Sequence, residues 1–279
     1  MKILIKTTVF SLALLCFGLQ MAGPARAEHH ADPVSAGLMK AVGGAHRSPA
    51  NQARDENRDP VETLAFFGIE PGMTVIELWP GGGWYTEILA PFLRDEGTLV
   101  AASYGMDTTP EYRPRLHKAL MYKVASNPDV YGSVKIIEWD PPRKTSLGAP
   151  GSADMVLTFR NTHSFINNGL ADSVFAEAFK VLKPGGVLGV VQHRAAPGAP
   201  ADSSESGYVT EQAVIALAQT AGFVAEARSE INANPKDTHD HPEGVWTLPP
   251  SYRLGDVDRE RYRGIGESDR MTLRFRKPR

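Results

Sequence analysis

The chain has 279 residues, 42% hydrophobic and 22% charged, so it can bury the core of one large domain or of two small ones. The formal net charge of −2 provides no overall electrostatic attraction to nucleic acid, and the composition is that of an ordinary globular protein. The basic tail at 274–279 does not change this expectation, because short basic ends are usually solvated termini. We therefore expect no nucleic-acid partner.

The first 27 residues have the order of a secretory signal peptide. Basic residues at the start precede an apolar run at 9–19 and an Ala-x-Ala site at 25–27. The run is shorter than the roughly 20 residues of a transmembrane helix, with an uncleaved anchor as the alternative, and no later segment is apolar enough to span a membrane. Cleavage would remove Cys16, the only cysteine, and with it any disulfide or thiolate-zinc site. We expect a mature start at Glu28 and an exported protein, periplasmic or secreted, with no stable membrane span.

The mature chain divides into a polar, loosely helical arm at 28–60 and a domain at 61–279. In the domain, apolar runs of strand length alternate with segments of helical spacing. The expected strands span 74–78, 98–102, 134–139, 154–159, 187–191, 223–227 and 271–275. The expected helices span 61–67, 84–93, 111–126, 170–182 and 210–221. Continuous apolar strands separated by helices predict an α/β fold whose parallel sheet is covered on both faces.

One long segment, 232–269, lacks clear regular elements. Its length predicts a lid or a binding loop, and Trp246 and Tyr252 within it are candidates to line an acceptor pocket or to pack the lid. It also contains His239 and His241 beside carboxylates, a pattern that can ligate zinc or another divalent ion. A polar surface loop is the alternative explanation for these histidines.

A glycine-rich turn separates the first expected strand from the helix that follows it. The segment reads Glu77-Leu78-Trp79-Pro80-Gly81-Gly82-Gly83. In an open parallel sheet, ligands bind beyond the carboxyl ends of the strands. Glycines there allow backbone N–H groups to approach a ligand, and the helix start favours a negative group. A glycine run alone is equally compatible with a turn that binds nothing.

This turn resembles motif I of the class I S-adenosylmethionine-dependent methyltransferases, in which an acidic residue precedes glycines between the first strand and helix. The likeness continues at Asp154, in the turn at 182–188 and in the last apolar strand. Two further segments, 80–86 and 269–278, are similar to those of exported predicted methyltransferases of bacteria. The resemblance implies a Rossmann-like, doubly wound, mostly parallel seven-stranded sheet with an antiparallel C-terminal strand, S-adenosyl-L-methionine as cofactor and a small-molecule methyl acceptor.

The resemblance also assigns positions to the cofactor. They are Glu77, Gly81, Gly82, Gly83, Asp140 and Arg160. The acidic residue and glycines of motif I would meet the amino-acid end of the cofactor, and Asp140 matches the residue that contacts the adenine amine. The end of the second strand, 101–104, departs from the family pattern because it lacks the acidic residue that holds the ribose hydroxyls.

The catalytic candidates follow the fourth and fifth strands, which are neighbours in this fold. They are Asn161, His163 and His193. Methyl transfer depends on positioning, and a histidine can take the proton that an oxygen or nitrogen acceptor loses. Either histidine can instead simply order its loop.

Three functions are compatible with these features. The first is a methyltransferase acting on a small molecule. The second is an exported, non-catalytic protein that binds a nucleoside or the cofactor. The third is a metal-assisted hydrolase that uses His239 and His241.

Overall fold

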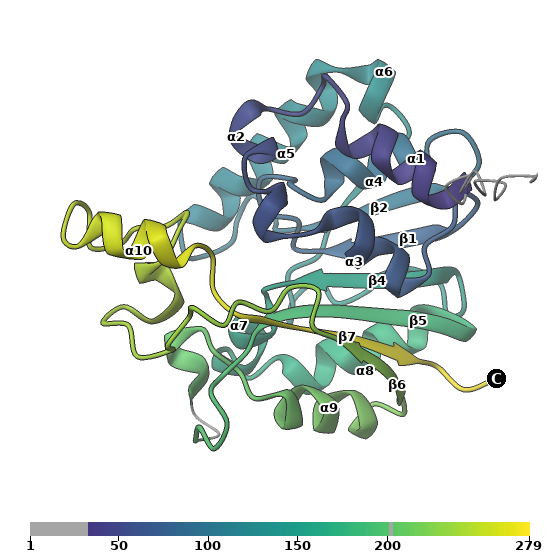
Figure 1. Ribbon diagram of the computed structural model, residues 1–279. Coiled ribbons are helices and arrows are strands. Elements are labelled where there is room, and N and C mark those ends of the chain that lie inside the picture. Colours follow the sequence, from purple (N-terminus) through teal and green to yellow (C-terminus); the bar gives the residue numbers. More distant parts are fainter. Residues whose placement is uncertain (1–32, 201–202) are drawn as a thin grey trace, which may run out of the picture. The chain divides into compact units, whose positions relative to one another are not determined.

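The computed structural model describes residues 33–200 and 203–279 (Figure 1). The predicted signal peptide and the start of the predicted arm lie outside the described residues. Within the described ranges, no helix has the length and apolar composition needed to cross a bilayer.

A single seven-stranded sheet organises the domain, in the order β3-β2-β1-β4-β5-β7-β6. The strands are β1 (Thr74–Leu78), β2 (Thr98–Ser103), β3 (Lys135–Glu138), β4 (Ala153–Phe159), β5 (Leu182–His193), β6 (Val224–Ser229) and β7 (Arg270–Arg276). The pairs among β1 to β5 are parallel, whereas β7 runs antiparallel to both β5 and β6. This confirms the expected mostly parallel α/β sheet with an antiparallel C-terminal strand. The strand order reverses between β1 and β4, which is where such sheets bind ligands.

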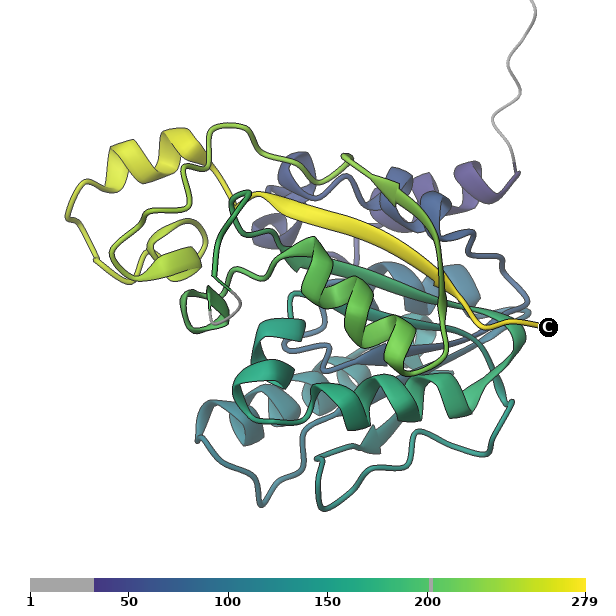
Figure 2. The same ribbon diagram turned by 90° about the horizontal axis from the view of Figure 1, so that it is seen from below.

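Helices cover both faces of this sheet (Figures 1 and 2). They are α1 (Pro33–Val42), α2 (Pro49–Gln52), α3 (Pro60–Phe67), α4 (Thr86–Leu93), α5 (Tyr112–Ser126), α6 (Pro128–Tyr131), α7 (Thr162–Asn167), α8 (Ala171–Val181), α9 (Glu211–Thr220) and α10 (Arg259–Ile265). Short 3-10 turns lie at Asp55–Asn57, Ser203–Ser206 and Gly244–Thr247.

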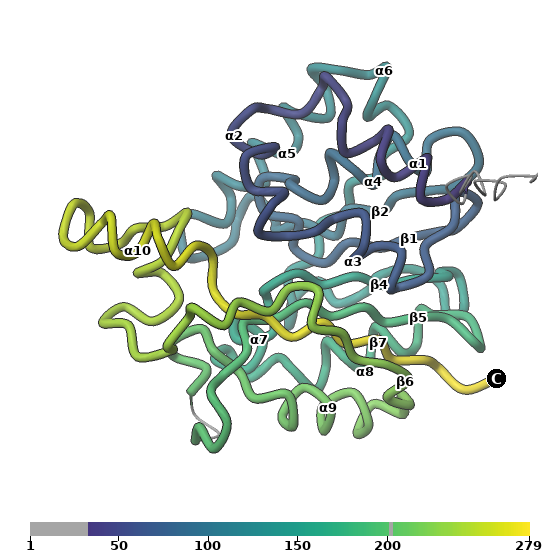
Figure 3. Tube along the Cα trace, viewed as in Figure 1, coloured from purple at the N-terminus to yellow at the C-terminus, as the bar shows by residue number. Residues whose placement is uncertain are grey.

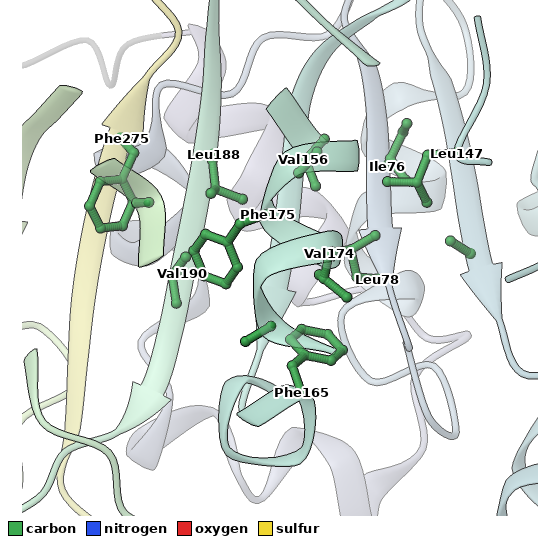
Figure 4. Close-up of a cluster of buried hydrophobic side chains, with 14 of the residues drawn as sticks. Ile76, Leu78, Leu147, Val156, Phe165, Val174, Phe175, Leu188, Val190 and Phe275 are labelled. Atoms are coloured by element: carbon green, nitrogen blue, oxygen red, sulfur yellow. The ribbon is translucent and has the colours of Figure 1, made fainter. Parts of the chain in front are cut away.

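The core beneath α8 and α9 is built from alternate residues of the strands (Figure 4). Val156 of β4 and Leu188 of β5 are partners in the parallel register, and both belong to the cluster that contains Phe175 of α8. Burying such side chains contributes about 1.5–3 kcal/mol each. The continuous apolar runs in the sequence are therefore explained by a sheet that is buried on two sides.

The opposite core lies beneath α1, α3 and α4. Leu38 of α1 and Ile88 of α4 pack in one cluster with Val75 of β1. The next residue of β1, Ile76, faces the other side of the sheet and belongs to the first core. The segment expected as an arm therefore supplies core residues from α1. On the same face, α3 lies so close to β5 that a Cβ on Gly189 would come within 2.9 Å of the Phe67 ring.

Two segments differ in detail from the sequence-based expectation. β5 begins at Leu182, five residues before its expected start, because the chain after β7 continues to pair with it: Gly185 N donates to Lys277 O at 2.9 Å. The predicted lid at 232–269 contains the 3-10 turn at Gly244–Thr247 and α10. The tube in Figure 3 shows α10 beyond the carboxyl ends of the parallel strands.

Candidate functional site

A cavity of about 760 Å³ opens at the carboxyl ends of β1, β4 and β5. Its volume lies within the roughly 300–1,000 Å³ of small-molecule sites. Of the nine residues predicted to bind the cofactor or to act in catalysis, seven line it: Glu77, Gly81, Gly82, Arg160, Asn161, His163 and His193. The lining does not include Gly83 or Asp140. The strand order thus brings most of the predicted residues to one place.

Glu77, at the end of β1, places a buried carboxyl group at this cavity. Thr86 Oγ1 donates to Glu77 Oε2 at 2.7 Å. Burial raises the pKa of Glu77 to about 7, against the opposing effects of Thr86 and of the Lys123 charge. A carboxylate has about four acceptor positions, so it retains capacity for a further donor from the cavity.

The glycine turn exposes backbone to the cavity. A Cβ built on Gly81 or Gly82 meets no atom within 4 Å, and only Gly81 has a positive φ, of 59°. Gly83 differs, because with φ at 80° its Cβ would lie 3.0 Å from Leu120 of α5. Gly81 and Gly82 thus leave room for a ligand, whereas Gly83 serves the tight turn into α4. The assignment of Gly81, Gly82 and Glu77 to the amino-acid end of S-adenosylmethionine stays a prediction.

Trp79 makes this turn unlike a purely glycine-rich one. It has a positive φ of 43°, a conformation that costs a side-chain-bearing residue about 1–2 kcal/mol. Its buried ring packs 4.9 Å from the ring of Tyr104 and 4.8 Å from that of Phe165, and its Nε1 donates to Trp139 O at 3.2 Å. These contacts hold the turn in place and put aromatic surface where β2 and β3 end.

The end of β2 carries no carboxylate, as its sequence indicates. Ser103 Oγ is hydrogen-bonded to His117 Nδ1 at 3.0 Å, while Tyr104 and Tyr112 line the cavity. Beyond β3, the carboxylate of Asp140 is paired with Arg143. Its assignment to the adenine amine stays a prediction.

The two candidate histidines lie together, as the neighbouring positions of β4 and β5 predict. Their ring centroids are 5.7 Å apart. Burial lowers the pKa of His163 to about 4, and burial, together with the nearby His163 and Arg160, lowers the pKa of His193 well below its ordinary value. Both imidazoles are therefore neutral near pH 7 and can act as acceptors of a proton.

Hydrogen bonds distinguish the two rings. The Gln192 amide is oriented because its Oε1 accepts from Thr162 N at 3.1 Å and its Nε2 donates to Gly207 O at 2.9 Å. The same Nε2 lies 3.3 Å from His163 Nδ1, which must then be the acceptor and already engaged. His193 Nδ1 instead bonds to Ser268 Oγ, which can accept, and this arrangement leaves the lone pair of Nε2 available. His193 is therefore the better placed base.

Asn161 connects the end of β4 to the glycine turn. Its Nδ2 donates to Leu78 O at 2.9 Å and to Trp79 O at 3.3 Å. This candidate is therefore a positioning residue for the turn, and its side chain also lines the cavity.

The lid contributes Trp246 to the cavity lining but not Tyr252. It is fastened by the buried carboxylate of Asp237, which accepts from Tyr208 Oη at 2.9 Å and lies 2.8 Å from His241 Nε2. His239 Nε2 lies 3.5 Å from a carboxylate oxygen of Asp269. His241 thus has a hydrogen-bonded partner, whereas His239 Nε2 makes no hydrogen bond among the described residues. The part of the chain that the structure describes contains no group of three or more His, Cys, Asp or Glu side chains arranged to hold a metal ion.

Several lining residues were not identified as site residues from the sequence. They include Trp79, Tyr85, Arg115, Glu267 and Ser268. For Glu267 and Ser268 the sequence offered one signal, because they immediately precede the segment 269–278 that carries part of the family resemblance. Arg54 also lines the cavity, although in the sequence it lies within a charged stretch of the expected arm.

Known structures share this architecture. A methyltransferase from Aquifex aeolicus, described as dependent on S-adenosylmethionine, matches 87% of this chain and 98% of its own, with 15% identity and a TM-score of 0.54. A geranyl diphosphate methyltransferase solved with S-adenosylmethionine matches 86% of this chain and 94% of its own, at 13% identity and a TM-score of 0.53. The chain has the fold of the class I methyltransferases.

The fold is also shared by a protein with another printed activity. The (4+2)-cyclase SpnF matches 88% of this chain and 93% of its own, with 16% identity and a TM-score of 0.54. No model of a known protein family matches the sequence. No curated protein matches it either. At these identities the likeness establishes the fold alone, so the function has to be argued from the cavity.

Proposed function

We propose that this protein is an S-adenosylmethionine-dependent methyltransferase that acts on a small-molecule acceptor. The observation that carries the proposal is one cavity that joins the open glycine turn and Glu77 to His193 and Asn161, at the reversal point of the sheet. Two of the solved neighbours support it at the level of the fold: a methyltransferase described as dependent on this cofactor and a methyltransferase solved with the cofactor bound.

The chain's own residues have distinct roles in this proposal. Glu77 would receive the ammonium group of the cofactor, and the backbone at Gly81 and Gly82 would lie against its amino-acid portion. Bound S-adenosylmethionine supplies an electrophilic methyl group. His193 Nε2 would take the proton from an oxygen or nitrogen acceptor, while Asn161 holds the turn in register with β4.

The direct test is turnover. Protein isolated from its native compartment is analysed for copurifying small molecules, and these are then supplied with S-adenosylmethionine as acceptors. The proposal expects S-adenosylhomocysteine and a methylated acceptor in equal amounts. S-adenosylhomocysteine binding without its formation from any such acceptor would contradict catalysis.

A non-catalytic binding protein is the second candidate, and Trp79 is the observation that favours it. The buried ring of Trp79 lies near the end of β2, and the strand end carries no carboxylate. The part of the cavity expected to hold adenosine therefore differs from the one the family pattern implies. Product formation discriminates between the two, because both functions predict binding and only the first predicts turnover.

We also propose export, on the basis of the N-terminal pattern. The expected mature protein begins at Glu28. N-terminal sequencing of protein from the producing cell tests this, and an intact Met1 would contradict it.

A further inference from the structure

One wall of the cavity carries an unbalanced group of arginines. The arginine group consists of Arg54, Arg58, Arg160 and Arg270, and it surrounds the single carboxylate of Glu267. Glu267 accepts from Arg54 Nε at 2.7 Å, from Arg58 Nε at 3.1 Å and from Arg270 Nη1 at 3.2 Å. Arg54, Arg160 and Glu267 line the cavity directly.

The donors of this group exceed its acceptors. Arg58 is 1% exposed, yet neither its Nη1 nor its Nη2 has a hydrogen-bond partner among the described residues, and Arg54 Nη2 is also buried without one. Burial lowers the pKa of Arg160 to about 10, with Glu267 opposing and the charges of Arg54 and Arg270 reinforcing the shift. Buried donors without acceptors cost free energy, and a guanidinium group binds oxyanions in a forked geometry. An anionic ligand in the cavity would supply an acceptor for Arg54, and its negative charge would offset the excess positive charge to which Arg58, which does not line the cavity, also contributes.

The position of the arginine group indicates which part of the ligand carries that anion. Ser268 follows Glu267 directly and bonds to His193, so the group adjoins the proposed base. Arg160 directly follows β4, and its positive charge lies close enough to His193 to help lower the pKa of that histidine. The amino-acid end of the cofactor is instead accommodated by Glu77 and the open glycine turn.

We propose that the arginine group binds an oxyanion, a carboxylate or a phosphate, that belongs to the methyl acceptor. Arg54 and Arg160 are its direct donors, while Arg58 and Arg270 hold Glu267 and add positive charge. This assigns Arg160 to the acceptor rather than to the cofactor. The identification of the ligand as the methyl acceptor rests on the proposed function, but oxyanion binding itself can be measured without any cofactor.

The experiment uses inorganic phosphate and benzoate as probes, at constant ionic strength set with chloride. Either probe that binds the folded protein raises its melting temperature in a concentration-dependent manner. We expect at least one probe to stabilise the wild type, and Arg54→Gln or Arg160→Gln to weaken its binding by about tenfold or more. Arg115→Gln, which removes the same charge from the α5 side of the cavity, should change the affinity for the probe less than twofold. Arg160→Lys keeps the charge but not the forked geometry, so its loss of affinity should lie between those of Arg160→Gln and Arg115→Gln.

A second arm identifies the source of the oxyanion. Affinities for S-adenosylhomocysteine and for methylthioadenosine, which lacks the amino-acid portion, are measured for the same variants. The proposal expects both affinities to stay within about twofold of wild type, and the probe to bind alongside S-adenosylhomocysteine. Loss of S-adenosylhomocysteine affinity alone, with displacement of the probe, would assign the arginines to the cofactor carboxylate and overturn the proposal. Absence of probe binding to the wild type would also overturn it, whereas failure of S-adenosylhomocysteine to bind would overturn the proposed function and leave the oxyanion site standing.

Discussion

The two ends of the cavity are built in different ways. The cofactor end is a continuous segment, in which β1, the glycine turn and the start of α4 follow one another between Thr74 and Leu93. The acceptor end is assembled from distant segments: Glu267 joins Arg54 across 213 positions and Arg58 across 209. A local strand–turn–helix unit can be recognised in a sequence, whereas a charge group that only the fold assembles cannot.

The two ends also differ in electrostatics. At the cofactor end, Glu77 is the buried carboxyl group that lines the cavity; burial raises its pKa, and it is poised to lose a proton to solvent when a cation binds. At the acceptor end, guanidinium groups outnumber carboxylates and both histidines are kept neutral by burial. The cavity thus offers a place for an ammonium group at one end and for an oxyanion at the other. Variants at the two ends should therefore have separable effects on cofactor binding and on turnover.

The largest effect is expected at the histidines. His193→Gln should lower turnover by about a hundredfold or more, because it removes the proposed base, while S-adenosylhomocysteine affinity remains nearly unchanged. His163→Gln should have a smaller effect, since its Nδ1 is already engaged by Gln192. Steady-state kinetics with the identified acceptor measures both. Equal losses of turnover in the two variants, or negligible losses in both, would contradict the assignment of His193 as the base.

The same base sets the acid limit of activity. A histidine base works only when neutral, and burial lowers the pKa of His193, so turnover at saturating cofactor should persist well below pH 6.5 and be lost only on further acidification. The corresponding stability runs in the same direction. The unfolded chain takes up this proton near pH 6.5 and the folded chain does not, so acidification below that value destabilises the fold.

Gly82→Leu should produce the next largest effect. The new side chain meets open cavity rather than backbone, and φ is not positive there, so the protein should fold while S-adenosylhomocysteine affinity falls at least about tenfold, or 1.4 kcal/mol. Gly72→Leu is the matched control, because that glycine is equally unconstrained but lies outside the cavity. Calorimetry measures both, and equal affinities for the two variants would exclude the turn as the binding site.

Glu77 should make cofactor binding dependent on pH. Below about pH 7 its carboxyl group is protonated in the free protein, and an ammonium group binds the ionised form, so S-adenosylhomocysteine affinity should fall by up to about tenfold per pH unit on acidification. Methylthioadenosine, which lacks the ammonium group, should show little such dependence. In Glu77→Gln, the affinities for the two ligands should show the same weak dependence on pH. A pH dependence that survives in that variant would assign it to another group.

The smallest effect is expected at Asp140. Its carboxylate is paired with Arg143 and lies outside the cavity lining, so Asp140→Asn should change S-adenosylhomocysteine affinity by less than about threefold. A larger loss would instead support the contact with the adenine amine that the family resemblance implies. Arg143→Gln is the control, because it breaks the same pair and leaves the carboxylate in place.

The sequence predicted the fold well because burial on two faces leaves continuous apolar runs. The strand at 74–78 was predicted with its observed bounds, since the turn at Gly72 and the glycines after it mark both ends. It also predicted that His163, which follows β4, and His193, at the end of β5, would lie together. It did not predict the longer β5, which depends on pairing with the chain after β7, or the core contribution of α1.

The acceptor end escaped prediction for a physical reason. Arg54 and Arg58 occur in a charged stretch that looks like a solvated helix face, and nothing local distinguishes them from exposed arginines. Only the fold buries Arg58 against the ring of Trp84, with its guanidinium carbon 4.5 Å from the ring centroid. Trp79 was similarly ambiguous, because its positive φ follows from packing against Tyr104 and Phe165 rather than from its own preference.

The proposed function depends above all on binding of the methyl-donor cofactor at the glycine-turn end of the cavity. A calorimetric titration of S-adenosylhomocysteine into the mature protein measures this binding. We expect one site per chain, binding that weakens as the pH falls below about 7, and loss of affinity in Gly82→Leu but not in Gly72→Leu. No binding at millimolar ligand, or equal binding to both variants, would contradict it.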